Sequence, residues 1–415
     1  MSETAAKGHD LATLLKQTPF LGQIDPAGKR VFVRADFNVP LDENGAMVDD
    51  GRLRSALPTI NYLLDHGARV IVASHMRNPL ESNGRPDKRY SFAPLARRLS
   101  RLWEAEVSFC PEVVGEQTLE AVEKLSSGKV LLLENLRFHP GETAADPQFA
   151  EQLAQLADIY VNDAFGVCHR PHASMITLPR LMETRVGGFA LKNELMALSR
   201  ALSHPARPLG AVIGGKNLNA KLPLLARFMR LADFVFLGGT IGDAMSRMAF
   251  NVDMAHLSLP ENSRQEMEEL LRPQLKRSAK LFMPIDALVT GPGGRSCDVE
   301  VAATPNLRPD MTAEDIGPAT CLWYQEVLSL CRTIIWSGPM GAFEEPAFTK
   351  GTAMVAKALV NCQGVTLAGG VDTSSAILKM SDRNQISFLS TGGSSFLKAL
   401  AGQPLVALEA LSDPI

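Results

Sequence analysis

The sequence predicts an α/β fold with two doubly wound, parallel-sheet (Rossmann-like) domains joined by a hinge helix. A chain of 415 residues is too long for one ordinary hydrophobic core. Short apolar runs alternate with helical patterns along most of it, which is typical of a parallel sheet covered by helices on both faces. Glycine-rich turns follow several apolar runs in the second half, where they would bring backbone close to a ligand.

Composition and charge favour a soluble globular protein, with 46% hydrophobic and 21% charged residues. A net charge of -3 argues against a polyanion held by overall charge, while a local basic cleft stays compatible with it. The six cysteines form no Cys-x-x-Cys pair, and the N-terminus lacks the apolar core of a signal peptide. We therefore expect a cytoplasmic protein without a nucleic-acid or membrane partner.

The first half begins with a polar extension and a short helix over residues 11–15. Apolar runs at 31–33, 70–73, 130–133 and 159–161 predict strands, and the patterns at 53–64 and 92–102 predict helices between them. We assign residues 1–185 to an N-terminal domain.

The alternation stops near residue 179 and resumes at about residue 209, with a connecting helix predicted over 192–202. Later strands are expected at 209–213, 234–237, 281–283, 333–336, 365–367 and 386–389, with helices at 222–231, 350–359 and 374–380 between some of them. We expect a connecting hinge helix over 186–203, a C-terminal domain over 204–395, and a segment over 396–415 that returns to the N-terminal domain.

Basic and imidazole groups follow the strands of the first half, where ligands of open α/β sheets bind. They are Arg52, His75, Arg77, Arg137, His169 and Arg170. Any one arginine could be a surface ion pair, but a set at successive strand ends would repel itself without an anion. We predict a small anionic ligand here and structural roles for His139 and His172.

The stretch GGKNLNAK (residues 214–221) joins an apolar run to a helical pattern. Glycines at a helix start leave backbone N–H groups free for an anion, and Lys216 and Lys221 add positive charge. On its own, the turn could equally serve backbone geometry.

Glycine turns also follow later strands, at 238–239, 338–341, 369–370 and 392–393. Several such turns facing one cleft would let the backbone approach a nucleotide. Asp372, beside Thr373, could be a magnesium ligand or a helix N-cap, and Glu344 could bind a ribose. The chain has no Gly-x-x-x-x-Gly-Lys-Ser/Thr loop, which excludes a P-loop enzyme.

These motifs in this order resemble phosphoglycerate kinase from about residue 24 to the C-terminus. The matching strings are VFVRADFNVPL (31–41), LENLRFH (133–139), YVNDAFG (160–166) with His169 and Arg170, DIGP (315–318), WSGPMGAFE (336–344), DT (372–373) and STGG (390–393). The resemblance implies reversible phosphoryl transfer between ATP and the carboxylate of 3-phosphoglycerate, giving ADP and 1,3-bisphosphoglycerate. It also implies Mg²⁺ as cofactor, 3-phosphoglycerate and ATP/ADP as partners, and a monomer.

The resemblance implies roles for individual residues. Substrate binding is carried over to Asp36, Asn38, Arg52, His75, Arg77, Arg137 and Arg170. Nucleotide binding is carried over to Gly214, Gly215, Lys216, Lys221, Gly338, Glu344, Gly369, Gly370, Asp372 and Thr373, with Asp372 as the metal ligand. The positions expected to act on the moving phosphoryl group are Arg52, Lys221, Gly370 and Gly393.

The chain departs from the family pattern mainly on the nucleotide side. Asn217 replaces a lysine, Ala220 an aspartate, Asn78 an arginine and Ser337 an asparagine, while Thr240, Val371 and Ser394 each replace the third glycine of a triplet. Arg77 and Lys216 each stand one position before a missing basic residue, so Lys216 could compensate for Asn217. Two alternatives stay open: a paralogue that uses another small phosphorylated or carboxylic substrate, and a weakly active or non-catalytic ligand-binding protein.

Overall fold

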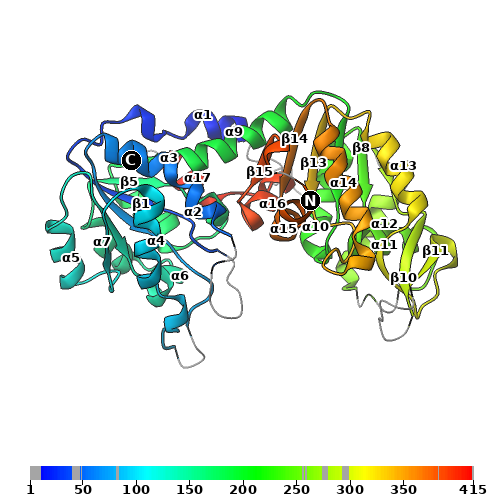
Figure 1. The fold of residues 1–415 in the computed structure, drawn as a ribbon, viewed down its shortest axis with the longest axis horizontal. Helices are drawn as coiled ribbons and strands as arrows, with labels where there is room; N and C mark the ends of the chain where they lie inside the picture. Colours follow the sequence, from blue (N-terminus) through cyan, green and yellow to red (C-terminus); the bar gives the residue numbers. More distant parts are fainter. Residues whose placement is uncertain are drawn as a thin grey trace. The chain divides into compact units, whose positions relative to one another are not determined.

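The computed structural model describes residues 11–39, 47, 49–80, 84–254, 257, 259–272, 279–291, 299–381 and 383–413. The chain divides into two compact units (Figure 1). Unit 1 contains Met1–Met196 and Pro404–Ile415, and unit 2 contains Ala197–Gln403. The chain passes between the units within helix α9 (Phe189–Ser203).

Unit 1 is built on a six-stranded sheet with the order β3-β4-β2-β1-β5-β6, in which every pairing is parallel. Its strands are β1 (Arg30–Arg34), β2 (Arg69–Ala73), β3 (Val107–Cys110), β4 (Val130–Leu133), β5 (Ile159–Asn162) and β6 (Thr184–Gly187). Val31 and Val33 pack into a core shared with α3 (Leu57–Asp65) and α4 (Ala93–Trp103), while Phe32, on the other face, stacks on Tyr160. Both faces are therefore apolar, as the continuous apolar runs predict.

The helices of unit 1 are α1 (Leu11–Gln17), α2 (Gly51–Ser55), α3 (Leu57–Asp65), α4 (Ala93–Trp103), α5 (Glu116–Glu123), α6 (Pro140–Thr143), α7 (Pro147–Ala154), α8 (Leu178–Leu181) and α17 (Val406–Ser412). α17 comes from the far end of the chain and packs against α1, α8 and β6. The amide of Ala407 donates to the carbonyl of Cys168 at 3.0 Å.

Two strands of unit 1, β3 and β6, were not predicted from the sequence. β3 is an edge strand of only four residues and only its last residue is buried, so its apolar signal is weak. β6 covers 184–187, where the connecting helix was expected to begin at 186; the helix begins at Phe189 instead. The amide of Gly187 donates to the carbonyl of Pro19 at 2.8 Å, which ties this last strand to the start of the chain.

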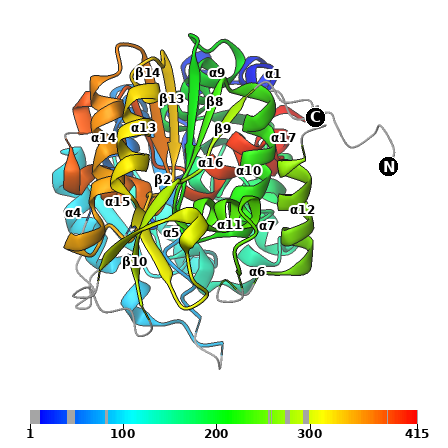
Figure 2. The same cartoon turned by 90° about the vertical axis from the view of Figure 1, so that its right-hand side faces the viewer.

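Unit 2 repeats the design with the parallel strand order β15-β14-β13-β7-β8-β9. Its strands are β7 (Leu209–Ile213), β8 (Phe234–Leu237), β9 (Lys280–Phe282), β13 (Thr333–Ser337), β14 (Val365–Gly369) and β15 (Phe388–Ser390). Figure 2 shows α13 (Pro318–Leu328), α14 (Lys350–Asn361) and α15 (Val371–Met380) on one side of this sheet. The opposite side carries α10 (Leu218–Leu231), α11 (Gly239–Ala249), α12 (Glu261–Leu271) and α16 (Gly393–Ala401).

A small antiparallel sheet in unit 2 was not anticipated. It has the order β11-β10-β12, formed by β10 (Asp286–Thr290), β11 (Glu300–Ala303) and β12 (Thr312–Ile316). β11 is largely exposed and β12 starts with exposed or half-buried residues, so neither shows a clear apolar alternation.

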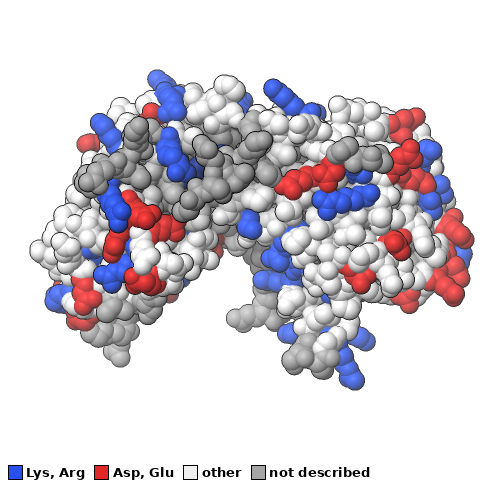
Figure 3. All heavy atoms as spheres, turned by 180° about the vertical axis from the view of Figure 1, so that it is seen from behind, with Lys and Arg blue, Asp and Glu red and all other residues white. Residues whose placement is uncertain are grey.

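Positive and negative side chains are interspersed over the face drawn in Figure 3, and neither sign covers a whole unit. This agrees with the nearly balanced charge of the sequence. Within the part of the chain that the structure describes, no helix has both the length and the apolarity to cross a bilayer.

Candidate functional site

In unit 1, Asp36 from the loop after β1 meets Arg52 from α2, beside the loop that follows β5. Arg52 Nη1 lies 2.6 Å from Asp36 Oδ2, and the backbone amide of Asn38 donates to Asp36 Oδ1 at 3.2 Å. Gly166 closes over the same carboxylate, because a Cβ at this glycine would stand 2.2 Å from Asp36 Oδ2. Three segments that are far apart in sequence therefore hold one half-buried ion pair in a fixed place.

The loop after β2 is joined to the loop after β1 by the side chain of Asn38, and to the loop after β4 by that of Arg137. The backbone amide of Arg77 donates to Asn38 Oδ1 at 2.9 Å, and the Arg137 guanidinium donates to the carbonyl of Arg77. Arg77 has a positive φ of 55°, and both it and Asn78 are exposed. Asp36, Asn38, Arg77 and Arg137 thus form one connected group at the carboxyl ends of the strands.

Arg137 is the most unusual member of this group. It is 7% exposed, and its Nε and Nη2 atoms are buried without a hydrogen-bond partner among the described residues. Burial, and then the charges of Arg170 and Arg34, lower its pKa to about 10. Buried donors of a charged group are rarely left unpaired, so these nitrogens indicate a place for an anion.

Arg34 is a buried member of the cluster and was not among the residues predicted from the sequence. It is fully buried and donates to Ser174 Oγ at 2.9 Å and to the carbonyl of Ala35. Its Nη2 lies 3.2 Å from His75 Nδ1 and 3.9 Å from Glu142 Oε1. Its only signal in the sequence is its place at the end of β1, just before Asp36, because a single buried arginine does not show in a hydrophobic pattern.

The two histidines that are buried in the described part of this unit, His75 and His172, have lowered pKa values, which favours their neutral form. Burial and then Arg34 hold the pKa of His75 well below its usual range. Since Arg34 donates toward Nδ1, we assign the proton of neutral His75 to Nε2, which makes that atom a donor. His172 has its pKa lowered to about 3 by burial and then by Arg137, and its Nδ1 lies 3.7 Å from Glu142 Oε1.

The remaining basic positions of the prediction lie at the rim of the same cluster. Arg170 is exposed and His169 is half-buried. His139 accepts from the amide of Gly141 at 3.1 Å and stacks on Phe149, which is a structural role.

In unit 2, the glycine turns after β7, β8 and β13 are bonded to one another through backbone groups. Gly214 donates to Ser337 O at 3.0 Å, Gly215 to Pro339 O at 2.8 Å, and Gly239 to Met340 O at 2.8 Å. Gly338 has a φ of 98°, and a Cβ there would stand 2.0 Å from the carbonyl oxygen of Gly214. Close approach of these backbones is therefore what requires the glycine at 338.

Lys221 runs beneath this set of turns. It is 6% exposed, and its Nζ donates to the carbonyl of Ser337 at 3.0 Å and to Ser337 Oγ at 2.9 Å. Burial lowers its pKa to about 8, against a smaller opposing effect of Asp372. A lysine with this pKa loses its charge at a much lower pH than an ordinary lysine does.

Asn217 and Lys216 occupy the turn between β7 and α10. Asn217 is the N-cap of α10, and its Oδ1 accepts from the amide of Ala220 at 3.2 Å. Lys216 is exposed. The asparagine therefore stabilises the start of the helix and provides no positive charge at this position.

The turns after β14 and β15 lie at the starts of two helices. Gly370, with a φ of 108°, is the N-cap of α15, so Asp372 is not the cap but lies exposed in the first turn. The hydroxyl of Thr373 accepts from the amide of Gly338 at 2.7 Å, which joins this turn to the one after β13. Gly392 is the N-cap of α16, which begins at Gly393. Glu344 is exposed, and Gly369 is buried at the end of β14.

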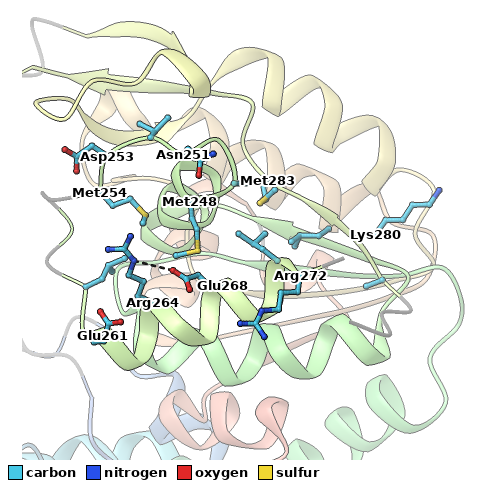
Figure 4. Close-up of a pocket in the computed structure, with 16 residues that line it drawn as sticks. Met248, Asn251, Asp253, Met254, Glu261, Arg264, Glu268, Arg272, Lys280 and Met283 are labelled. Carbon is cyan, nitrogen blue, oxygen red and sulfur yellow. Dashed lines mark ion pairs between the residues drawn. The ribbon is translucent and has the colours of Figure 1, made fainter. Parts of the chain in front are cut away.

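A sizeable cavity lies elsewhere in the described part of unit 2. It measures about 1410 Å³ and lies between α11, α12 and β9 (Figure 4). Its charged side chains carry both signs, with Arg264 3.5 Å from Glu268, and it contains none of the predicted site residues. The glycine turns and Lys221 are therefore the better nucleotide-site candidates.

Comparisons with known proteins agree with this arrangement. The sequence model of the family described as phosphoglycerate kinase matches residues 21–403. The phosphoglycerate kinase of Aquifex aeolicus is 40% identical, over 95% of this chain and 98% of its own length. That of Desulfosudis oleivorans is 39% identical, over 94% of this chain and 98% of its own.

Solved structures give the same result. Phosphoglycerate kinase from Coxiella burnetii is similar with a TM-score of 0.79 and 31% identity, covering 95% of this chain and 98% of that one. The enzyme from Pyrococcus horikoshii has a TM-score of 0.82 and 28% identity, with the same coverage. The family match spans both units and all of the predicted site residues, and from it we conclude that the chain belongs to the phosphoglycerate kinase family.

Proposed function

We propose that this protein is a phosphoglycerate kinase that transfers a phosphoryl group reversibly between ATP and the carboxylate of 3-phosphoglycerate. Membership of the family supports the reaction class. The observation that carries the substrate assignment is Arg137, whose two buried nitrogens lack partners within the described part of unit 1. A phosphate oxygen would satisfy them and would also neutralise the cluster of like charges around them.

Each predicted residue of unit 1 takes a role that fits its contacts. His75, Arg137 and Arg170 hold the 3-phosphate, with neutral His75 donating from Nε2. Asp36 and Asn38 contact the glycerate part. Arg52, held by Asp36 at 2.6 Å, lies by the carboxylate and the transferred phosphoryl group. Arg77, which is exposed, binds the substrate from the edge of the site.

Unit 2 binds the nucleotide at its glycine turns. Backbone amides from Gly369, Gly370 and Gly393 line the phosphoryl path. Gly214, Gly215 and Gly338, whose amides already donate within the protein, let the backbone approach the nucleotide closely. Lys221 supplies positive charge from below, Lys216 supplies it at the start of α10, and Glu344 contacts the ribose. Thr373 fixes the backbone of Gly338 through its 2.7 Å hydrogen bond.

The nucleotide would carry Mg²⁺, and Asp372 would hold it. Among the described residues there is no group of three or more His, Cys, Asp or Glu side chains that could bind a metal by themselves. One exposed carboxylate nevertheless fits this ion, because Mg²⁺ usually takes one or two protein carboxylates and completes its shell with phosphates and water. When bound, the ion would neutralise phosphate charge.

The chemistry asks little of the protein beyond placement and charge. The substrate carboxylate is already ionised and needs no general base. Phosphoryl transfer is accelerated by aligning the two reacting oxygens and by stabilising the charge of the moving group. Arg52 and Lys221, with the amides of Gly370 and Gly393, are the groups of this chain suited to that task.

Asn217 favours a second candidate, a paralogue with low activity or with another small phosphorylated or carboxylic acid as substrate. It caps a helix where the family supplies a lysine to the phosphoryl group. Loss of one transition-state charge costs on the order of 10²–10³ in rate.

We also propose that the protein is a cytoplasmic monomer. The scattered cysteines support the cytoplasmic location, and the resemblance to the phosphoglycerate kinase family supports the monomer. Sedimentation equilibrium would test the oligomeric state.

A coupled assay tests the main proposal. Purified protein is given Mg-ATP with 3-phosphoglycerate, or with a panel of other small phosphorylated acids and simple carboxylic acids. Turnover with 3-phosphoglycerate alone supports the kinase, and turnover with another acid supports the paralogue. If there is no turnover and calorimetry detects no ATP binding, the kinase proposal fails.

A further inference from the structure

We propose that Ser337 is a positioning residue, whose hydroxyl holds the Lys221 ammonium where it meets the nucleotide phosphates. This inference rests on the function proposed above and adds a residue to its nucleotide site. Ser337 ends β13 and is 1% exposed, while Lys221 belongs to the second turn of α10.

The contacts of Ser337 are arranged around Lys221. Its hydroxyl accepts from Lys221 Nζ at 2.9 Å and donates to the carbonyl of Gly369 at 3.2 Å. Its own carbonyl accepts both from Lys221 Nζ at 3.0 Å and from the amide of Gly214 at 3.0 Å. One serine thereby links the ends of β7, β13 and β14 to a single lysine.

Donor counting indicates what this arrangement does. An ammonium group has three N–H donors, and Ser337 accepts two of them. The lysine chain passes below Gly215, with its Cε 3.9 Å from the point where a Cβ of that glycine would lie. The third donor is thus available to a phosphate bound at the turn, while the other two fix the direction in which it points.

This device matters more in this chain than in one with a second lysine at position 217. Asn217 is engaged in capping α10, so Lys221 is the buried cation of this turn. Its placement then determines how well the site stabilises phosphate charge, because preorganised charges act without reorganisation during the reaction.

The test is a double-mutant cycle between Ser337→Ala and Lys221→Met, read as kcat, as KM for 3-phosphoglycerate and as Mg-ADP affinity by calorimetry. Ser337→Ala should lower kcat and Mg-ADP affinity by about tenfold and leave KM for 3-phosphoglycerate unchanged. In the Lys221→Met background it should have almost no further effect. Ser337→Thr, which keeps the hydroxyl, should restore most of the loss.

Thr333→Val is the matched control. Thr333 starts the same strand, and its hydroxyl donates to the carbonyl of Ala206 at 2.8 Å. It should lower the melting temperature about as much as Ser337→Ala does while leaving kcat unchanged. If Ser337→Ala acts equally with and without Lys221, or matches Thr333→Val in kcat, the inference is wrong. A wild-type protein without turnover would contradict the proposed function instead, and the cycle would still be read from Mg-ADP binding.

Discussion

Arg52 Nη1 lies 2.6 Å from Asp36 Oδ2, and Gly166 covers this pair so closely that any Cβ would stand 2.2 Å from the carboxylate oxygen. The first two residues follow β1 and begin the next helix, whereas the glycine follows β5. The close approach of Gly166 to Asp36 depends on the parallel pairing of β1 with β5. Local sequence alone could not place them within contact.

Gly166→Ala should therefore displace Asp36 and Arg52. We expect kcat/KM for 3-phosphoglycerate to fall by about tenfold or more, because small displacements of positioned groups are costly. Gly22→Ala is the control in the same unit, since its nearest neighbour, Phe189, is 3.9 Å from the added Cβ. Equal steady-state kinetics for the two variants would show that the fixed position of this ion pair is unimportant.

Arg137→Met should weaken substrate binding without weakening the free protein. We expect KM for 3-phosphoglycerate to rise about 10–100-fold, from the loss of charged hydrogen bonds. The free energy of unfolding without ligand should stay equal or rise, because two buried unpartnered nitrogens disappear.

Arg30→Met is the control for that variant. Arg30 pairs with Asp158 at 2.6 Å in a partly exposed position at the other end of β1. It should leave KM unchanged. An Arg137→Met protein that is strongly destabilised, with normal KM, would identify Arg137 as a structural residue.

Asn217→Lys should increase activity at the expense of stability. The variant loses the cap on Ala220, which costs about 1 kcal/mol of unfolding free energy, and regains a charge that could raise kcat by about 10²-fold. Asn217→Ala loses the cap alone and should lower the melting temperature without raising kcat.

Lys216→Ala completes this comparison, measured in the same coupled assay. If Lys216 compensates for the missing lysine, its removal lowers kcat in the wild-type background and has little effect beside Asn217→Lys. Little loss of activity in the wild-type background would end the compensation hypothesis.

The pH dependence of nucleotide use should follow Lys221. Its pKa is lowered to about 8 in the free protein, so the charged fraction falls as the pH rises through 8. We expect kcat/KM for Mg-ATP to decline by about tenfold per pH unit above that value. A bound phosphate favours the ammonium, so the decline in kcat should occur at higher pH. A kcat/KM profile that stays flat to about pH 9.5 would contradict the role of Lys221.

Asp163 should make the stability of the protein depend on pH in the opposite sense to an ordinary paired carboxylate. Its Oδ1 accepts from the amides of Ala190 and Leu191, its Oδ2 is buried without a described partner, and burial raises its pKa to about 6. Between the pKa of Asp163 in the unfolded chain and about 6, the folded state binds more protons than the unfolded state. The contribution of this group to the free energy of unfolding therefore falls as the pH rises.

Asp163→Asn removes that titration. Relative to wild type, the variant should gain about 1–3 kcal/mol of unfolding free energy between pH 4 and pH 7.5, measured by urea denaturation. A pH-independent difference between the two proteins would show that Asp163 does not titrate in this range.

The sequence predicted the parallel sheets well because their central strands are continuous apolar runs. It missed β3, β6, β11 and β12, because edge strands and half-exposed strands carry little apolar signal. It also missed β10, which is mostly buried between β11 and β12. The candidate site was predicted from strand-end motifs, but its geometry was not.

Arg34 and Ser337 show why. Arg34 is fully buried and contacts His75, which is more than 40 residues away in the sequence. Ser337 binds Lys221, which is more than 100 residues away. Only the folded chain brings these partners together.

The initial rate of ADP formation from Mg-ATP, measured with and without 3-phosphoglycerate, tests the central claim most directly. We predict ADP formation that requires 3-phosphoglycerate, saturates with it, and is accompanied by 1,3-bisphosphoglycerate. ADP formation that is absent, or that is unaffected by 3-phosphoglycerate, would contradict the assignment of this protein as a phosphoglycerate kinase.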